Sequence, residues 1–241
     1  MKNFKNTSRR LVGGLFAVCL LSLTLSLSSC LKGHETTPPT PVALLSVIQD
    51  SPGQPPLDFT LDGTRVNANQ IVYGGGLDYF RAYVGKRTAA FTKSGAGGVV
   101  FSDTLTLKQN FAYTLCLVNK PTAPGFLVLT DAITQPASGT ANLRFVNLSP
   151  DAPAVDLAVK DGAVLVPNKG FKGFSDFASI TSKTYTFEIR KAGTTTVLAT
   201  LANVNINAGY VYTVYLRGLT DATDATKLTA DLIINAYPGL N

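Results

Sequence analysis

Two aspartates, Asp151 and Asp156, flank a proline-containing segment in the second half of the sequence and are the first candidates for chemistry. Two neighbouring carboxylates can act as acid and base in glycoside hydrolysis. Their spacing is equally explained by tight turns, whose main-chain N–H groups donate to aspartate side chains. We favour the structural interpretation, keep both aspartates as candidate ligand-facing residues, and rank a hydrolase that uses them as the weakest functional alternative.

The remaining residue types give little support to catalysis. His34 is the single histidine and lies near the N-terminus, outside the predicted folded part, so a catalytic triad or a histidine-based zinc site is not expected there. Asp151, Asp156 and Asp161 do not have the spacing of a calcium-binding loop. We therefore predict a protein that is not an enzyme and that uses neither a metal nor a cofactor.

Tyr79 and Tyr83 form a second group of candidate ligand-facing residues. They follow three consecutive glycines, Gly74 to Gly76, which we interpret as a flexible loop. A phosphate-binding loop would need a helix after the glycines, and none is predicted. Packing of the two tyrosines on a sheet is the simplest interpretation, and a platform for a ligand is the alternative. Tryptophan, the usual sugar-stacking residue, is absent from the chain.

The N-terminal 29 residues have the pattern of a secretory signal peptide. Residues 1–10 carry four basic side chains, and residues 11–27 are apolar or small. The string LSSC at 27–30 resembles the lipobox of bacterial lipoproteins. This resemblance implies cleavage before Cys30 and attachment of lipid to its sulfur, which would anchor the protein to a membrane.

Residues 30–41 form a spacer rich in proline and threonine between the lipidated cysteine and the folded part. If extended at about 3.1 Å per residue, the spacer reaches roughly 30 Å. We predict anchoring to the outer membrane, with the folded part facing either the periplasm or the cell surface. Without the four basic leader residues, 17 of the 21 basic residues remain against 15 acidic ones, and they are scattered, so we predict no nucleic-acid partner.

An internal duplication organises the rest of the chain. Residues 43–63 align with residues 141–162 at a shift of 98, which places Ser51 on Ser149 and Asp58 on Asp156. The duplication predicts two domains, residues 42–136 and 137–241. The glycine run at 74–76 has no evident counterpart and is interpreted as an insertion in the first copy.

Alternating apolar and polar residues predict β-strands in both copies. In the second copy we expect a bend at a sheet edge over 149–153, a hairpin at Asp161-Gly162, and a second hairpin around 207–209 that pairs 196–206 with 210–216. About seven strands per hundred residues is the density of a β-sandwich. Cys116 aligns with Tyr215 and is expected to be a buried packing residue.

The segments RFVNLSPDAPAVDLAVKDG and NVNINAGYVYTVYLRG resemble domain of unknown function 4397, a family of bacterial envelope proteins that are often lipoproteins. The resemblance covers residues 141–218 well and residues 43–131 more weakly, where Gly53 replaces Asp151 and Asn110 replaces Gly209. It implies two tandem immunoglobulin-like sandwiches, and it supplies no catalytic residue.

These observations favour a lipid-anchored envelope protein that acts as a non-catalytic binding, adhesion or structural module. Its partner would be an envelope protein or a glycan, in addition to the membrane that holds the lipid. The alternative is an accessory subunit of an outer-membrane complex, bound through exposed strand edges that can pair with another chain.

Overall fold

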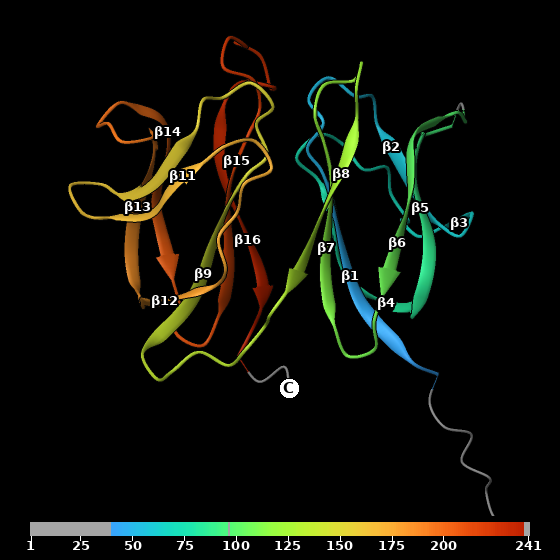
Figure 1. The fold of residues 1–241 in the computed structure, drawn as a ribbon, viewed down its shortest axis with the longest axis horizontal. Helices are drawn as coiled ribbons and strands as arrows, with labels where there is room; N and C mark the ends of the chain where they lie inside the picture. Colours follow the sequence, from blue (N-terminus) through green and yellow to red (C-terminus); the bar gives the residue numbers. More distant parts are fainter. Residues whose placement is uncertain (1–39, 96, 239–241) are drawn as a thin grey trace, which may run out of the picture. The chain divides into compact units, whose positions relative to one another are not determined.

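A computed structural model describes residues 40–95 and 97–238 of the protein, and all regular elements in these ranges are β-strands (Figure 1). The predicted signal peptide, Cys30 and all but the end of the predicted spacer lie outside the described residues. Within the described ranges, no helix is long and apolar enough to cross a membrane. In these ranges sixteen strands form four four-stranded sheets, which confirms the predicted all-β class.

The first half of the chain is a sandwich of two sheets, with strand orders β4-β1-β7-β8 and β3-β2-β5-β6. All neighbours in these sheets are antiparallel except β1 and β7, which run parallel. Leu45, Phe59, Phe91 and Leu115 lie in the core between the two sheets. The strands are β1 (Val42–Gln49), β2 (Leu57–Leu61), β3 (Thr64–Arg65), β4 (Gly76–Tyr83), β5 (Gly85–Lys93), β6 (Val99–Leu107), β7 (Ala112–Val118) and β8 (Gly125–Asp131).

The second half repeats this plan, with strand orders β12-β9-β15-β16 and β11-β10-β13-β14. Its parallel pair is β9 with β15, and its core contains Phe145, Leu157, Phe187 and Val214. The predicted β-sandwich arrangement is therefore confirmed, and each half of the described chain contains eight strands. The strands are β9 (Thr140–Asn147), β10 (Val155–Val159), β11 (Val164–Lys169), β12 (Ala178–Thr181), β13 (Lys183–Lys191), β14 (Val197–Ile206), β15 (Val211–Arg217) and β16 (Thr229–Ala236).

The predicted division at residue 136 falls between β8 and β9. Independent folding of 42–136 and of 137–241 stays a prediction, because the two sandwiches also share a set of buried residues. We call this shared contact the seam. It joins the outer face of sheet β4-β1-β7-β8 to the outer face of sheet β12-β9-β15-β16 through the buried side chains Ile48, Cys116, Val118, Leu129, Val146, Leu148 and Tyr215.

Cys116 and Tyr215, which the duplication aligns, lie together in the seam. Burial raises the pKa of the Cys116 thiol far above its ordinary value. A buried thiol of this kind is a packing residue, as the sequence indicated.

The glycine loop before β4 is not an insertion. Gln49 N–H donates to the Gly75 carbonyl at 2.8 Å, and at the same shift of 98 Asn147 N–H donates to the Gly173 carbonyl at 2.9 Å. Gly74 N–H donates in turn to the Gln49 carbonyl. Main-chain hydrogen bonds therefore hold the loop against the end of β1. The two loops share their main-chain hydrogen bonds but not their side chains, so a comparison of the sequences does not reveal that they correspond.

Two predicted connections are wrong. Strand β14 pairs with β13, whereas β15 pairs with β9 and β16, so residues 207–209 cross from one sheet to the other and form no hairpin. The bend at 149–153 likewise crosses between sheets and joins two inner strands, β9 and β10. Alternation identifies a strand but not its partner. The hairpin at Asp161-Gly162 is confirmed, since β10 and β11 are antiparallel neighbours.

Gly76 offers a test of the loop geometry. A Cβ atom at this position would overlap the carbonyl oxygen of Val47 in the facing strand. We expect Gly76→Ala to lower the free energy of unfolding by roughly 1 to 3 kcal/mol, measured by urea denaturation, because the main chain must shift to accept the methyl group. Gly170→Ala is the matched control, since a Cβ at Gly170 meets no atom within 4 Å. Equal stabilities of the two variants would contradict the described geometry.

Candidate functional site

A buried ion pair between the two sandwiches forms the centre of the seam. Arg144 Nη1 lies 2.6 Å from Asp131 Oδ1, and the side chains are 2% and 0% exposed. Arg144 Nε also donates to Thr213 Oγ1 at 2.8 Å. Asp131 Oδ2 accepts from the Tyr79 hydroxyl at 2.5 Å and from Thr114 Oγ1 at 2.7 Å. One charged residue from each sandwich is therefore neutralised by the other inside the protein.

Asn235 closes this network on the side of the second sandwich. Its amide nitrogen donates to the Tyr79 hydroxyl oxygen at 3.0 Å, and its carbonyl oxygen accepts from Thr213 Oγ1 at 2.6 Å. Burial is the main cause of a strongly raised pKa of the Tyr79 phenol, and the neighbouring Asp131 carboxylate adds to it. The phenol therefore stays protonated and acts as a donor, which fixes the direction of the hydrogen bonds around it.

The network draws on corresponding positions of the two copies. Thr114 and Thr213 lie on the equivalent strands β7 and β15, and each faces the strand that carries Asp131 or Asn235. At a shift of 98, Arg144 replaces Ser46 and Phe177 replaces Tyr79. The two outer faces thus keep the same geometry while one copy supplies the anion and the other the cation.

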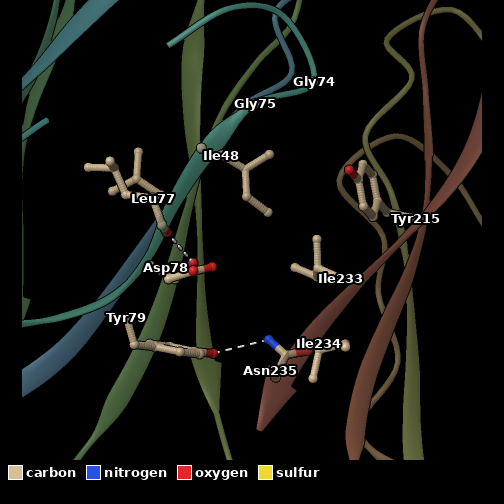
Figure 2. A pocket seen from close by; sticks show the side chains of 13 residues that line it. Ile48, Gly74, Gly75, Leu77, Asp78, Tyr79, Tyr215, Ile233, Ile234 and Asn235 are labelled. Atoms are coloured by element: carbon tan, nitrogen blue, oxygen red, sulfur yellow. Dashed lines mark hydrogen bonds between the residues drawn. The ribbon is translucent and has the colours of Figure 1, made fainter. Parts of the chain in front are cut away.

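A first cleft of about 150 Å³ opens beside the network (Figure 2). One wall consists of Gly74 to Tyr79, and the other of Tyr215 and Ile233 to Asn235. Figure 2 shows the Asn235 amide directed at the Tyr79 hydroxyl across the cleft. Asp78 lies in the wall and is exposed. The cleft combines main-chain groups, one carboxylate and apolar side chains.

A second cleft of about 200 Å³ lies on the other side of Arg144. Its lining includes Arg144, Phe174, Asp176 and Phe177, together with the hydroxyl groups of three other residues, Thr130, Thr134 and Ser175. The Arg144 guanidinium carbon is 4.5 Å from the centre of the Phe177 ring. This cleft therefore offers aromatic surface, hydroxyl groups and one exposed carboxylate.

The two clefts are equivalent under the duplication. Asp78 aligns with Asp176 at a shift of 98, and Tyr79 aligns with Phe177. In both copies an exposed aspartate is followed by an aromatic residue in the lining of a cleft. Sequence reasoning missed this pair, although the repeat shift would have aligned it.

The predicted site residues are not brought together. Tyr79 lies in the network, whereas Tyr83 is 62% exposed at the far end of the same strand. Asp156 is buried and accepts from the main-chain N–H groups of Asn168 and Gly193 at 2.7 and 2.9 Å.

Asp151 has a different set of partners. It accepts from the Thr220 N–H at 3.0 Å and lies 3.4 Å from Lys120 Nζ. Both Asp151 and Asp156 thus make the bonds expected of structural aspartates, and a role for either in ligand binding stays a prediction. In the described part of the chain, no group of three His, Cys, Asp or Glu side chains is placed to hold a metal ion.

Asp50 is a buried acid at the edge of the seam. Its side chain is fully buried, and neither carboxylate oxygen has a hydrogen-bond partner among the described residues. Burial raises the pKa of Asp50 from 3.8 to about 7, although the Arg217 guanidinium acts in the opposite direction. The aligned position in the second copy is Leu148, which packs in the seam. Asp50 is therefore a polar residue at a place where its counterpart is apolar.

The fold and the clefts define a protein of two β-sandwiches joined face to face, with a concave site on either side of the joint. Residues 43–158 match the family described as Domain of unknown function (DUF4397), and this segment belongs to that family. The match covers the first sandwich, where the resemblance is weaker to the eye, and ends within β10. No curated protein matches the sequence.

Solved structures resemble the chain only distantly. The Bacillus anthracis TIE protein is 13% identical, over 73% of this chain and 34% of that one, with a TM-score of 0.25. Family 41 carbohydrate-binding modules from streptococcal virulence factors, solved for alpha-glucan recognition, are 13% identical over 78% and 96% of the two chains, with a TM-score of 0.25.

A third structure is the family CBM26 module of Eubacterium rectale Amy13K with maltoheptaose. It is 10% identical over 81% of this chain and 98% of that one, with a TM-score of 0.24. The chain spans about a third of the TIE protein's length. These scores are too low to transfer a ligand to this chain.

The ion pair leads to a first prediction for the site. Arg144→Met leaves the Asp131 carboxylate buried without its cation, so we expect the free energy of unfolding to fall by about 3 to 5 kcal/mol. Adding Asp131→Asn removes the unpaired charge, keeps one carbonyl oxygen that can accept from both Tyr79 and Thr114, and should recover at least half of the loss. Lys120→Met, which breaks the exposed pair with Asp151, is the control and should cost less than about 1 kcal/mol. A double variant no more stable than Arg144→Met would contradict the assignment of a buried charge pair.

Asp50 leads to a prediction about pH. The pKa of Asp50 is higher in the folded state than in the unfolded state, because burial favours the neutral carboxyl group. Its contribution to the free energy of unfolding is therefore complete below about pH 4 and is lost as the pH rises through 7. Asp50→Leu, which introduces the residue found at the aligned position 148, should therefore stabilise the protein increasingly between pH 4 and pH 8. The measurement is the urea midpoint of both proteins across this range. Parallel profiles would show that Asp50 titrates normally.

Proposed function

We propose that the protein is a lipid-anchored module of the bacterial outer membrane that binds an envelope component, a glycan or a protein, in the two clefts beside the seam. The lipobox-like LSSC string supports the anchor, with Cys30 as the attachment site. The observation that carries the binding function is the pair of equivalent clefts, each with an exposed aspartate next to an aromatic ring.

The chemistry of the clefts suits binding. An aspartate accepts hydrogen bonds from hydroxyl or amide groups or pairs with a cation, and an aromatic ring covers apolar C–H surface of a ligand. The first cleft adds the main chain of the glycine loop, and the second adds hydroxyl side chains. Neither the Asp78 nor the Asp176 side chain is committed to an ion pair among the described residues.

The seam supports this function by holding the cleft walls in place. Tyr79 belongs to the first sandwich and Asn235 to the second, and their hydrogen bond spans the first cleft. Arg144 stacks on Phe177 in the second cleft while it pairs with Asp131 of the opposite sandwich. Walls that are fixed before binding lose less conformational entropy when a ligand binds.

Binding to isolated envelope fractions tests this proposal. We expect the purified protein without its lipid to bind either peptidoglycan or an outer-membrane fraction in a sedimentation assay. Asp78→Asn together with Asp176→Asn should weaken binding about tenfold, equivalent to about 1.4 kcal/mol. Asp103→Asn, which removes an exposed carboxylate from β6, is the control and should bind normally.

Two outcomes would contradict the binding proposal. One is that no fraction binds and that deletion leaves envelope integrity and attachment unchanged. The other is binding that survives the double substitution. Protease treatment of intact cells then distinguishes the two sides of the outer membrane. Released fragments would place the clefts on the cell surface, and full protection would place them in the periplasm.

Exposed strand edges favour a second candidate function, an accessory subunit of an outer-membrane complex. Strands β6 and β14 are the outermost strands of their sheets, and they are nine and ten residues long. Such edges can accept a strand from another protein. Crosslinking in cells that recovers a stable partner protein through β6 or β14 would support this function. Recovery of no crosslinked partner would contradict it.

A further inference from the structure

One end of the first sandwich gathers the start of the folded chain and two loops. Val42, at the start of β1, is opposite Tyr83, at the end of β4. Gly85 is opposite Leu107, so the turn into β5 and the loop after β6 lie at this end as well. Asn110 N–H donates to the Val42 carbonyl at 3.2 Å. We call this region, residues 41–44, 81–87 and 107–111, the tether end, because the spacer joins it at Pro41 (Figure 1).

The tether end exposes large apolar side chains. Leu44, Tyr83 and Phe111 are 41%, 62% and 45% exposed. Leu44 N–H donates to the Phe111 carbonyl at 2.9 Å, and Leu44 lies two residues along β1 from the partner of Tyr83, on the same face of the sheet. Single exposed apolar side chains are common on protein surfaces, but three that gather at one end of a sandwich indicate a contact with something outside the chain.

Basic side chains also lie at the tether end. Arg81, Lys86 and Lys108 are exposed, and none of the ion pairs among the described residues involves them. Lys108 Nζ lies 5.8 Å from the centre of the Phe111 ring. Asp62, which pairs with Arg87 at this end, lies 3.0 Å from its guanidinium group. The tether end is therefore both apolar and positively charged.

We propose that the tether end lies against the bilayer, with Tyr83, Phe111 and Leu44 at the level of the lipid headgroups and the basic side chains on anionic phosphates. Tyrosine suits this boundary because it combines an apolar ring with a polar hydroxyl group, and lysine and arginine extend their charged ends to the headgroups from apolar stems. Electrostatic attraction to anionic lipid adds to the buried apolar area.

The position of the tether favours the bilayer over other occupants. This inference rests on the proposed lipid anchor at Cys30, because ten residues, 31–40, then separate the lipid from Pro41 and span roughly 30 Å at about 3.1 Å per residue. A short tether holds the end near the membrane at a local concentration on the order of millimolar, so a weak surface affinity is sufficient. A second copy of the chain fits less well, since it would bring basic groups of the same sign together.

The absence of tryptophan from the sequence allows single-tryptophan reporters. The Tyr83→Trp protein reports on the tether end. The Val99→Trp protein is the matched control, because Val99 is 65% exposed at the opposite end of β6. Both full-length lipidated proteins are reconstituted into phosphatidylethanolamine–phosphatidylglycerol vesicles that contain lipids brominated near the headgroup. We expect quenching of tryptophan fluorescence to be at least about threefold stronger for Tyr83→Trp, because interfacial side chains sit only about 5 to 10 Å deep.

A charge test separates a specific contact from mere proximity. Lys86→Glu with Lys108→Glu, added to Tyr83→Trp, should reduce the quenching to the level of the Val99→Trp control, and so should vesicles of phosphatidylcholine alone. Equal quenching of the two reporters in vesicles that carry the protein would overturn the inference and leave the anchor intact. Failure of the wild-type protein to float with vesicles, together with an unmodified Cys30 by mass spectrometry, would overturn the anchor and this inference with it.

Discussion

The buried pair of Arg144 and Asp131 is the constraint on which the arrangement of the two sandwiches depends. Transfer of two charges out of water is costly, and their mutual attraction only roughly offsets this cost. The pair therefore adds little net stability, but it selects one arrangement strongly. Any other contact that buries Arg144 or Asp131 apart from its partner would leave a charge unpaired, so we infer that the pair favours a single register of the apolar residues in the seam.

The duplication explains why this pairing is available. Two identical copies that associate through the same face would place like residues at equivalent positions on both sides. In this chain the threonines at 114 and 213 are still identical, whereas Ser46 has Arg144 as its counterpart. The two faces that meet in the seam are thus complementary in charge, while the arrangement of their strands stays close to two-fold symmetric. The two clefts are the parts of the same outer faces that the seam leaves uncovered.

The sequence predicted the features that depend on local periodicity. Alternating residues gave the strands, and the shift of 98 gave the two copies, because both follow from the order of residues along the chain. The partners of β15 were not predictable in this way. Residues 210–216 alternate as an outer hairpin strand would, yet β15 lies between β9 and β16, and only tertiary packing decides between these neighbours.

The seam was hidden for a related reason. Arg144 occupies an outward-facing position of β9, where a charged residue normally indicates solvent. The outer face is covered only because a second sandwich packs on it, and one copy considered alone cannot show this. Asp78 and Asp176 could have been found, since the shift aligns them, but the glycine loop before Asp78 was interpreted as an insertion and broke the alignment there.

Strand β4 connects the two proposed surfaces of the protein. Its outward-facing side chains begin at the first cleft, pass Tyr79 in the network, and end with Arg81 and Tyr83 at the tether end. A strand rises about 3.4 Å per residue, so the cleft and the tether end are held roughly 20 Å apart by a single extended segment. On the proposed orientation the first cleft therefore stands at a fixed height above the bilayer. The sheet, and not the spacer, would then set the distance at which an envelope ligand is held.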